Sequence, residues 1–214
     1  YLEELIIKNK ITHIINYNTN HFSEYLISFF QNNYKLKIAV YYNDSPFSSH
    51  PSKLIYYNNQ KNTFNKYDHI FVYRNEDQKK LERYYNLLGK NIKIIPPSCP
   101  EKKYLKYIKS TDDYLYDFAF IGHYESDGRL NVIGKLISLG YKCLVVGLKW
   151  PEKFLEHCSF GKSTVQNKQL SYTDYLSMLS SARVNLGFLS KINNDIYTRR
   201  YFECPFSNSL FLAY

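Results

Sequence analysis

The sequence predicts an α/β protein made of two domains, each a parallel β-sheet flanked by helices. Short β-branched runs alternate with helix-patterned segments along the chain, which is the order typical of a parallel sheet. Pro96 and Pro97 interrupt this alternation, a highly charged stretch follows at 101–113, and the alternation then starts again. We therefore place a first domain at 1–97, a linker at 98–113 and a second domain at 114–214.

The first half contains four short apolar runs that we interpret as strands, at 11–17, 37–42, 67–73 and 91–95. Apolar side chains at helical spacing predict helices at 2–10, 22–30 and 76–88, the last of them ended by Gly89. Residues 47–66 are polar and weakly patterned, so we expect a loop that holds one helix. Because the strands are joined through helices, they should run parallel with helices on both faces of the sheet.

The second half repeats the pattern, with strands predicted at 117–121, 143–147, 183–189 and 210–214. One helix is predicted at 130–139, closed by Gly140. A second helix opens with Ser171 as its N-cap and Asp174 in the capping-box position. Trp150 directly follows a strand, where it either stacks on a base or packs in the core.

Composition narrows the possible partners. The 214-residue chain is 44% hydrophobic and 22% charged, as expected of a globular protein with a sizeable core, and its formal charge of +9 favours an anionic partner. The lysines are scattered, which argues against a polyanion-binding tail. Four distant cysteines without a C-x-x-C pair predict neither a zinc site nor a disulfide framework, so we expect a reduced, cytoplasmic protein.

The ends and the hydropathy of the chain lead to two further expectations. No apolar run approaches the roughly 20 residues of a membrane span, although peripheral contact with a membrane stays open. The chain starts with Tyr1 inside an apparent helical pattern, and we therefore expect an internal piece of a longer protein.

The stretch 193–203 carries candidate binding residues. Asp195 and Glu203 lie eight residues apart, with Arg199 and Arg200 between them. If the second half of the stretch begins a helix, its backbone N–H groups, Thr198 and the two arginines gather at the positive end and form an anion site. Glu203, about one turn further in, would accept hydrogen bonds from a pair of sugar hydroxyls. A diphosphate beside hydroxyls describes a nucleotide sugar.

The same stretch allows a simpler interpretation. Tyr197, Tyr201 and Phe202 have the spacing of an amphipathic helix whose aromatic face enters the core. In that case the charged side chains of the helix are solvated and bind nothing.

A second candidate lies at the start of the second domain. The strand at 117–121 runs into Gly122, and a predicted helix follows Arg129. A strand, a glycine turn and a helix form a phosphate-binding arrangement in outline, because Gly122 lets a ligand approach the backbone. The three-glycine spacing of a dinucleotide site is absent. Arg129 either reaches a phosphate or sits on a solvated helix face.

Several of these segments together resemble the nucleotide-binding domain of GT-B glycosyltransferases, and the spore-maturation-protein-B-like group in particular. The resemblance rests on Asp117-Phe-Ala-Phe-Ile-Gly122 with Arg129, on 170–175 through 182–186, and on Arg200-Tyr-Phe-Glu203, which is similar to an "R-x-F-E" stretch of that group. In the first half, 42–46 and 67–71 are similar to later elements of the family's acceptor domain.

The resemblance implies two Rossmann-like domains facing each other across a cleft, with the sugar donor held by the second. The family's Glu-x7-Glu pair falls on Asp195 and Glu203, so Asp departs from the pattern at the first position. By resemblance, Glu203 binds the ribose hydroxyls, Asp195 lies near the donor sugar, and Arg199 or Arg200 neutralises the departing pyrophosphate without a metal.

The implied activity is transfer of a sugar from a UDP- or GDP-sugar, bound as substrate, to a glycan, protein or small-molecule acceptor, with no metal and no cofactor. The implied catalytic residues are Asp195 and Arg199, and the implied donor-binding residues are Gly122, Arg129, Thr198, Arg199, Arg200 and Glu203. One alternative is a non-catalytic GT-B-like protein that binds a nucleotide or glycan. A second is a basic module for single-stranded nucleic acid, which the dispersed charge disfavours.

Overall fold

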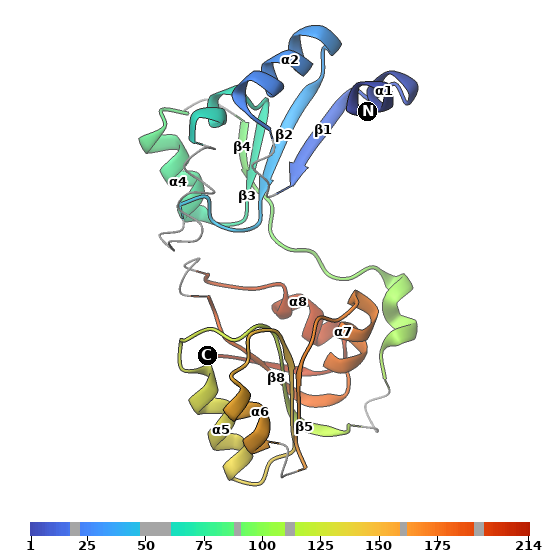
Figure 1. Cartoon of the computed structure of the whole chain (residues 1–214), viewed down its shortest axis with the longest axis vertical. Helices are drawn as coiled ribbons and strands as arrows, with labels where there is room; N and C mark the ends of the chain where they lie inside the picture. Colours follow the sequence, from blue (N-terminus) through green and yellow to red (C-terminus); the bar gives the residue numbers. More distant parts are fainter. Residues whose placement is uncertain (18–21, 48–60, 88–90, 110–113, 159–161, 191–194) are drawn as a thin grey trace. The chain divides into compact units, whose positions relative to one another are not determined.

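The computed structural model describes residues 1–17, 22–47, 61–87, 91–109, 114–158, 162–190 and 195–214. The chain divides into two compact units, Tyr1–Pro96 and Pro97–Tyr214. Each unit contains one parallel sheet with helices packed on it (Figure 1).

Unit 1 has a four-stranded parallel sheet in the order β1-β2-β3-β4. Its strands are β1 (His13–Tyr17), β2 (Lys37–Tyr42), β3 (His69–Val72) and β4 (Asn91–Ile94). Its helices are α1 (Leu2–Lys8), α2 (Glu24–Tyr34), the 3-10 helix η1 (Lys61–Lys66) and α4 (Asn75–Tyr84). All four strands predicted for this half are confirmed, with slightly different ends. Gly89, the predicted helix stop, lies outside the described residues.

The core of unit 1 lies on one face of its sheet. Ile38, Val40 and Tyr42 alternate along β2 and are fully buried against side chains of α2, η1 and α4. This alternation is the period-2 signature of a strand with one inward face. On the edge strand β1, Ile15 and Tyr17 stay more than half exposed, so the described residues leave this part of the second face uncovered.

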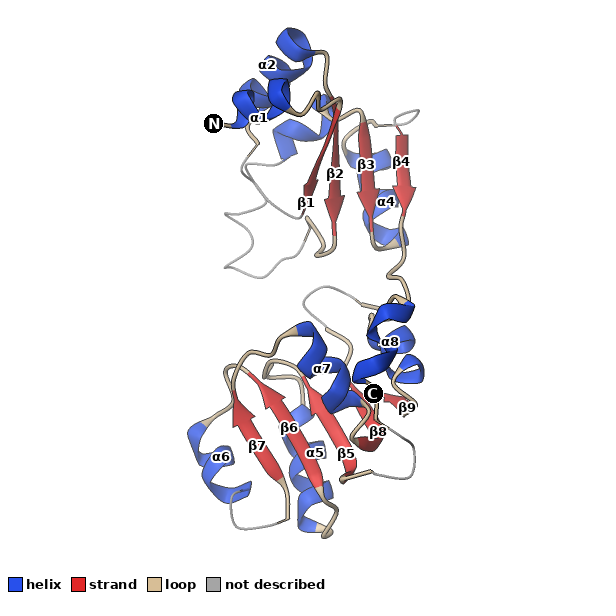
Figure 2. Cartoon of the chain, turned by 90° about the vertical axis from the view of Figure 1, so that its right-hand side faces the viewer, coloured by secondary structure: helices blue, strands red, loops and turns tan. Residues whose placement is uncertain are grey.

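Unit 2 has a five-stranded parallel sheet in the order β7-β6-β5-β8-β9 (Figure 2). Its strands are β5 (Tyr116–Ile121), β6 (Cys143–Gly147), β7 (Thr164–Asn167), β8 (Ala182–Gly187) and β9 (Leu210–Ala213). Its helices are the 3-10 helix η2 (Lys102–Tyr107), α5 (Arg129–Ser138), α6 (Glu152–Cys158), α7 (Tyr172–Leu179) and α8 (Arg200–Phe206).

The sheet of unit 2 is covered on both faces. Helices α5 and α6 lie on one side of it and α7 and α8 on the other (Figure 1). Ile133 and Phe154 belong to the core cluster on the first side, and Leu176, Leu179 and Cys204 to the cluster on the second. All five residues of β6 are buried, which is why this strand reads as a continuous apolar run.

The sequence missed three elements of unit 2, namely η2, α6 and β7. The strand β7 is a short edge strand without a fully buried residue, and its sequence, Thr-Val-Gln-Asn, lacks an apolar alternation. The predicted start of α7 is confirmed, since the Ser171 hydroxyl accepts a hydrogen bond from the Asp174 amide at 3.1 Å.

The turn after β5 lies directly against the end of β6. A Cβ atom at Gly147 would lie 2.0 Å from the carbonyl oxygen of Gly122 and 2.4 Å from its carbonyl carbon. Both atoms belong to the backbone and have no rotamer with which to move away, so only glycine allows this approach.

We expect Gly147→Ala to destabilise the chain by about 1–3 kcal/mol or more, because overpacking against backbone forces the β5 turn away from β6. The matched control is Gly134→Ala in α5, where a new Cβ would meet its nearest neighbour, a ring atom of Phe154, at 4.0 Å. That control should be neutral or stabilising by up to about 1 kcal/mol. Urea unfolding of both variants tests the contact, and equal effects would contradict it.

Candidate functional site

A cavity of about 290 Å³ opens at the carboxyl edge of the sheet in unit 2. It is lined by the ends of β5 and β6, the loop after β7 and the first turn of α7, namely Ile121, Gly122, His123, Val146, Gly147, Lys168, Gln169, Leu170, Ser171, Tyr172 and Tyr175. In parallel α/β sheets, ligands bind at this edge, near the point where the strand order reverses. Here that point is β5, which pairs with β6 on one side and β8 on the other.

The α7 wall of the cavity is tied to a buried carboxylate on α8. The Tyr175 hydroxyl donates to one oxygen of Glu203 at 2.7 Å, and the Tyr172 hydroxyl donates to the other oxygen at 3.2 Å. Arg199 adds an ion pair, with its Nε 3.4 Å from Glu203. The residues that shape the cavity and the predicted donor-site residue therefore form one hydrogen-bonded unit.

Glu203 itself is only 3% exposed, and Cys204 beside it is fully buried. In contrast, Tyr201 and Phe202 keep 41% and 37% of their surface exposed. The amphipathic alternative, with an aromatic face in the core and solvated charges, is therefore wrong. The helix α8 packs its glutamate inward because three donors compensate the buried charge.

The same buried environment raises the pKa values of side chains in and beside the cavity wall. Burial, followed by the negative charge of Glu203, raises the pKa of Tyr172 to about 12. Burial also raises the pKa of Tyr175 well above its ordinary value, and it raises the pKa of Cys204 to about 12. At neutral pH both tyrosines thus keep their hydroxyl protons and remain donors to the carboxylate.

The two consecutive arginines have different surroundings. Arg199 is half exposed and pairs with Glu203. Arg200 is half-buried, donates to the carbonyl of Ile121 and stacks over Phe120 at 5.6 Å. Within the part of the chain that the structure describes, Arg200 forms no ion pair, and its Nε is buried without a hydrogen-bond acceptor. No acid among these described residues therefore pairs with its positive charge.

Arg200 also reaches the cavity rim. A Cβ at Gly122 would lie 2.9 Å from a terminal nitrogen of Arg200, so this guanidinium lies directly against a residue that lines the cavity. Thr198 accepts a hydrogen bond from the Arg200 amide at 3.2 Å and thereby shapes the start of α8. The structure brings together Gly122, Thr198, Arg199, Arg200 and Glu203 around the ends of β5 and α8.

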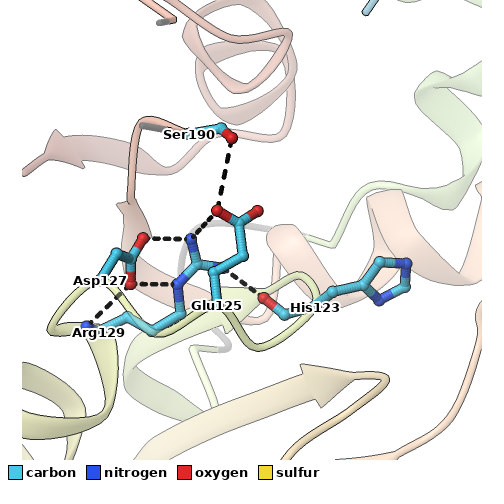
Figure 3. Close-up of polar contacts among 5 residues, drawn as sticks. All are labelled: His123, Glu125, Asp127, Arg129 and Ser190. Atoms are coloured by element: carbon cyan, nitrogen blue, oxygen red, sulfur yellow. Dashed lines mark hydrogen bonds and ion pairs between the residues drawn. The ribbon is translucent and has the colours of Figure 1, made fainter. Parts of the chain in front are cut away.

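Arg129 lies beside the same turn but is fully engaged (Figure 3). Arg129 is 3% exposed. Its guanidinium donates to Asp127 at 2.5 and 2.8 Å and to the carbonyl of His123, and it lies 3.4 Å from Glu125. Asp127 additionally accepts the backbone N–H of Arg129, which is the position a phosphate would take at the start of α5. Arg129 therefore has no guanidinium N–H directed to a phosphate at the start of α5 in this arrangement.

Asp195 is half-buried in the segment that follows β8. Its backbone N–H donates to the carbonyl of Ser190 at 3.1 Å. Ser190 also donates to Glu125 at 3.4 Å, which joins this segment to the turn after β5 (Figure 3). Residues 191–194, which include the first two residues of the predicted stretch, lie outside the described residues.

Trp150 packs instead of presenting its ring to a ligand. It is 3% exposed, contacts Phe120 and Phe154, and donates its Nε1–H to the Gly122 carbonyl at 3.1 Å. The base-stacking interpretation is therefore wrong. Sequence reasoning instead missed His123, Tyr172 and Tyr175. The i, i+3 spacing of the two tyrosines at the start of α7 was the available signal, but their partner Glu203 comes 28 residues after Tyr175.

Unit 1 has its own buried polar cluster at the carboxyl ends of β2 and β3. Ser45 donates to Asp77 at 2.6 Å, and Arg74 donates to the carbonyl of Asn43 at 2.9 Å and lies 3.7 Å from Asp77. Burial raises the pKa of Asp77, and the Ser45 hydrogen bond and the Arg74 charge oppose that rise. This cluster holds the loop after β2 against the start of α4.

Among the described residues, no group of three or more His, Cys, Asp or Glu side chains is arranged to hold a metal ion. Across the same residues, none of the helices is both long enough and apolar enough to cross a membrane.

No protein-family model and no curated protein matches the chain. Solved structures do. A UDP-forming α,α-trehalose-phosphate synthase from Burkholderia xenovorans has a TM-score of 0.62 and 10% identity, over 99% of this chain and 60% of that one. A glycosyltransferase from Rickettsia africae has a TM-score of 0.60 and 13% identity, over 99% and 60%. A UDP-N-acetylglucosamine 2-epimerase from Rickettsia bellii has a TM-score of 0.54 and 16% identity, over 86% and 53%.

At these identities the likeness concerns the fold. It confirms the predicted class, two parallel sheets flanked by helices as in GT-B proteins. The chain spans about 60% of the length of the trehalose-phosphate synthase and of the glycosyltransferase.

The Tyr175–Glu203 hydrogen bond can be measured by a double-mutant cycle. We expect Tyr175→Phe and Glu203→Met each to destabilise the chain by about 1–3 kcal/mol, because each leaves a buried partner unsatisfied. The double variant should lose less than the sum by about 1 kcal/mol or more. Tyr25→Phe, at a residue 76% exposed, is the neutral control. Strictly additive losses would show that the contact contributes nothing.

The raised tyrosine pKa predicts a loss of stability at alkaline pH. Above the ordinary tyrosine pKa of about 10, the unfolded chain releases the Tyr172 proton while the native chain keeps it, so the free energy of unfolding falls as pH rises toward about 12. Urea midpoints between pH 9 and 11 should fall less steeply for Tyr172→Phe than for the wild type. Parallel slopes would contradict this origin.

Proposed function

We propose that this chain is part of a glycosyltransferase that moves a sugar from a UDP- or GDP-sugar to an acceptor. The observation that carries the proposal is Arg200, a half-buried guanidinium without an acid partner among the described residues, at the strand-order reversal of unit 2 and beside a cavity. An uncompensated cation in such a position favours an anionic ligand. The resemblance to the spore-maturation-protein-B-like group supports the same activity.

The cavity suits the nucleoside end of such a donor. Its volume of about 290 Å³ is at the lower end of small-molecule sites, which occupy roughly 300–1,000 Å³. That size fits a base with part of its ribose. Leu170, Tyr172 and Tyr175 supply apolar and aromatic surface for the base, while Gly122 lets the ligand lie close to the backbone.

Glu203 is assigned to the ribose hydroxyls. A carboxylate offers about four lone-pair positions, and Glu203 uses three of them on Tyr172, Tyr175 and Arg199. Counting the described residues, one position therefore remains, which serves one of the two ribose hydroxyls. Thr198 positions the start of α8 through its bond to the Arg200 amide.

The chemical contribution of the chain is electrostatic. Cleavage of the bond between sugar and diphosphate leaves negative charge on the leaving phosphate, and Arg200, with Arg199 nearby, stabilises it. This would replace a metal ion in the same task. Asp195 lies near the donor sugar in this proposal, and unit 1 supplies the acceptor side for a glycan, protein or small molecule.

A non-catalytic protein that only binds the nucleotide is the second candidate. It is favoured by Asp195, which stands where the resembling enzymes have Glu. Both candidates require the nucleotide site, and turnover separates them.

A thermal-shift panel of UDP, GDP, ADP and CDP tests the site. One nucleotide, which we expect to be UDP or GDP, should stabilise the wild type by roughly 2.7 kcal/mol at about 100 times its Kd. Arg200→Gln should lose most of this ligand-induced shift and Arg200→Lys should retain part of it. The matched control is Arg183→Gln, an exposed arginine on β8 of the same unit.

Absence of a shift with all four nucleotides, or a full shift in Arg200→Gln, would refute the site. Where the shift is present, release of nucleoside diphosphate from the corresponding sugar nucleotide supports the transferase. A bound donor that is never turned over with any acceptor class supports the non-catalytic candidate.

A further inference from the structure

His123 lines the cavity and is exposed, and the roles assigned above do not use its imidazole. Its Nδ1 accepts a hydrogen bond from the backbone N–H of Leu148 at 3.1 Å. Because a backbone N–H can only donate, Nδ1 must be unprotonated in this arrangement. The neutral ring therefore carries its proton on Nε2, and no hydrogen-bond acceptor for Nε2 occurs in the described ranges.

The turn that carries His123 is held on both sides of the residue. The Gly122 amide donates to the Val146 carbonyl at 2.8 Å, and the Tyr124 amide donates to the Leu148 carbonyl at 3.0 Å. Trp150 donates to the Gly122 carbonyl at 3.1 Å. The ring is thus placed by the backbone of the β6 end before any ligand arrives, which lowers the entropy cost of binding.

Arg129 completes this support from the other side. It donates to the carbonyl of His123, and Figure 3 shows the imidazole pointing away from the Arg129 group. Asp127 and Glu125 balance the charge of Arg129. Arg129 is accordingly a positioning residue, since it fixes the backbone of His123 while the ring points away from it.

We propose that His123 donates its Nε2–H to a phosphate oxygen of the bound nucleoside diphosphate, an inference that rests on the function proposed above. Arg200 lies against Gly122, the residue before His123, since it donates to the Ile121 carbonyl and lies 2.9 Å from where a Cβ of Gly122 would be. An anion attracted by Arg200 therefore meets the β5 turn. The base would then contact the side of the cavity formed by Leu170, Tyr172 and Tyr175.

His123 then distinguishes a nucleoside diphosphate from a nucleoside. The contact is a charge-assisted hydrogen bond from a neutral donor, so it is lost when the phosphate is absent. Removal of such a bond to a charged group weakens binding by about tenfold or more.

Two substitutions distinguish the role of Nδ1 as an acceptor from the role of Nε2 as a donor. In His123→Gln the side-chain amide can place an N–H near the Nε2 position. In His123→Asn the shorter amide can still accept the Leu148 N–H through its oxygen, but its donor does not extend to the Nε2 position. Calorimetric titration compares UDP with uridine and GDP with guanosine on the wild type and both variants, and melting temperatures verify that each variant is folded.

We expect His123→Asn to weaken nucleoside diphosphate binding about tenfold and to leave nucleoside binding unchanged. His123→Gln should retain most of the diphosphate affinity. A long-range proton–nitrogen spectrum of the free wild type should show the His123 proton on Nε2.

Unchanged diphosphate affinity in His123→Asn would overturn the proposal, as would an equal loss of nucleoside affinity, which would assign the ring to the base or to the fold. Diphosphate binding that depends on Arg200 but not on His123 would overturn this inference alone. A wild type that binds neither UDP nor GDP would overturn the proposed function together with it.

Discussion

The backbone of the β5 turn lies directly on the end of β6, and the arrangement of the cavity depends on this contact. The approach leaves no room for a Cβ at Gly147, and it brings the turn within hydrogen-bond distance of the chain that leaves β6. The amides of Gly122 and Tyr124, the indole of Trp150 and the imidazole of His123 then bond across it. A turn held this closely can present its backbone and one side chain to a ligand in a fixed geometry.

Two arginines lie near this turn, Arg129, which is buried, and Arg200, which is half-buried. Their different ion pairing explains why we assign a structural role to the first and a binding role to the second. Both guanidinium groups stack over Phe120, Arg129 at 5.3 Å and Arg200 at 5.6 Å. Arg129 is paired with Asp127 and Glu125, and these two carboxylates neutralise its charge. Arg200 donates to a carbonyl and has no acid partner among the described residues, so the favourable interaction with an anion remains available. The difference lies in the neighbours, since the two side chains are chemically identical.

The buried carboxylate of Glu203 connects the cavity to α8. A charge placed so deeply is unfavourable unless several donors compensate it, and Tyr172, Tyr175 and Arg199 do so. The tyrosines remain neutral because the same burial raises their pKa. Each group thereby stabilises the protonation state that the other requires.

The sequence alone determined the α/β class, the alternation of strands and helices, the N-cap at Ser171 and the helix that contains Glu203. These features follow from local periodicity and capping chemistry, which are written within a few consecutive residues. The same reasoning missed β7, whose polar residues lie at a sheet edge, and it assigned a phosphate contact to Arg129. Only the tertiary structure decided that Arg129 is enclosed by acids, that Glu203 faces inward and that His123 borders the cavity. Each of those outcomes depends on a partner brought close by folding, such as Leu148 for His123, and no spacing in the sequence encodes that distance.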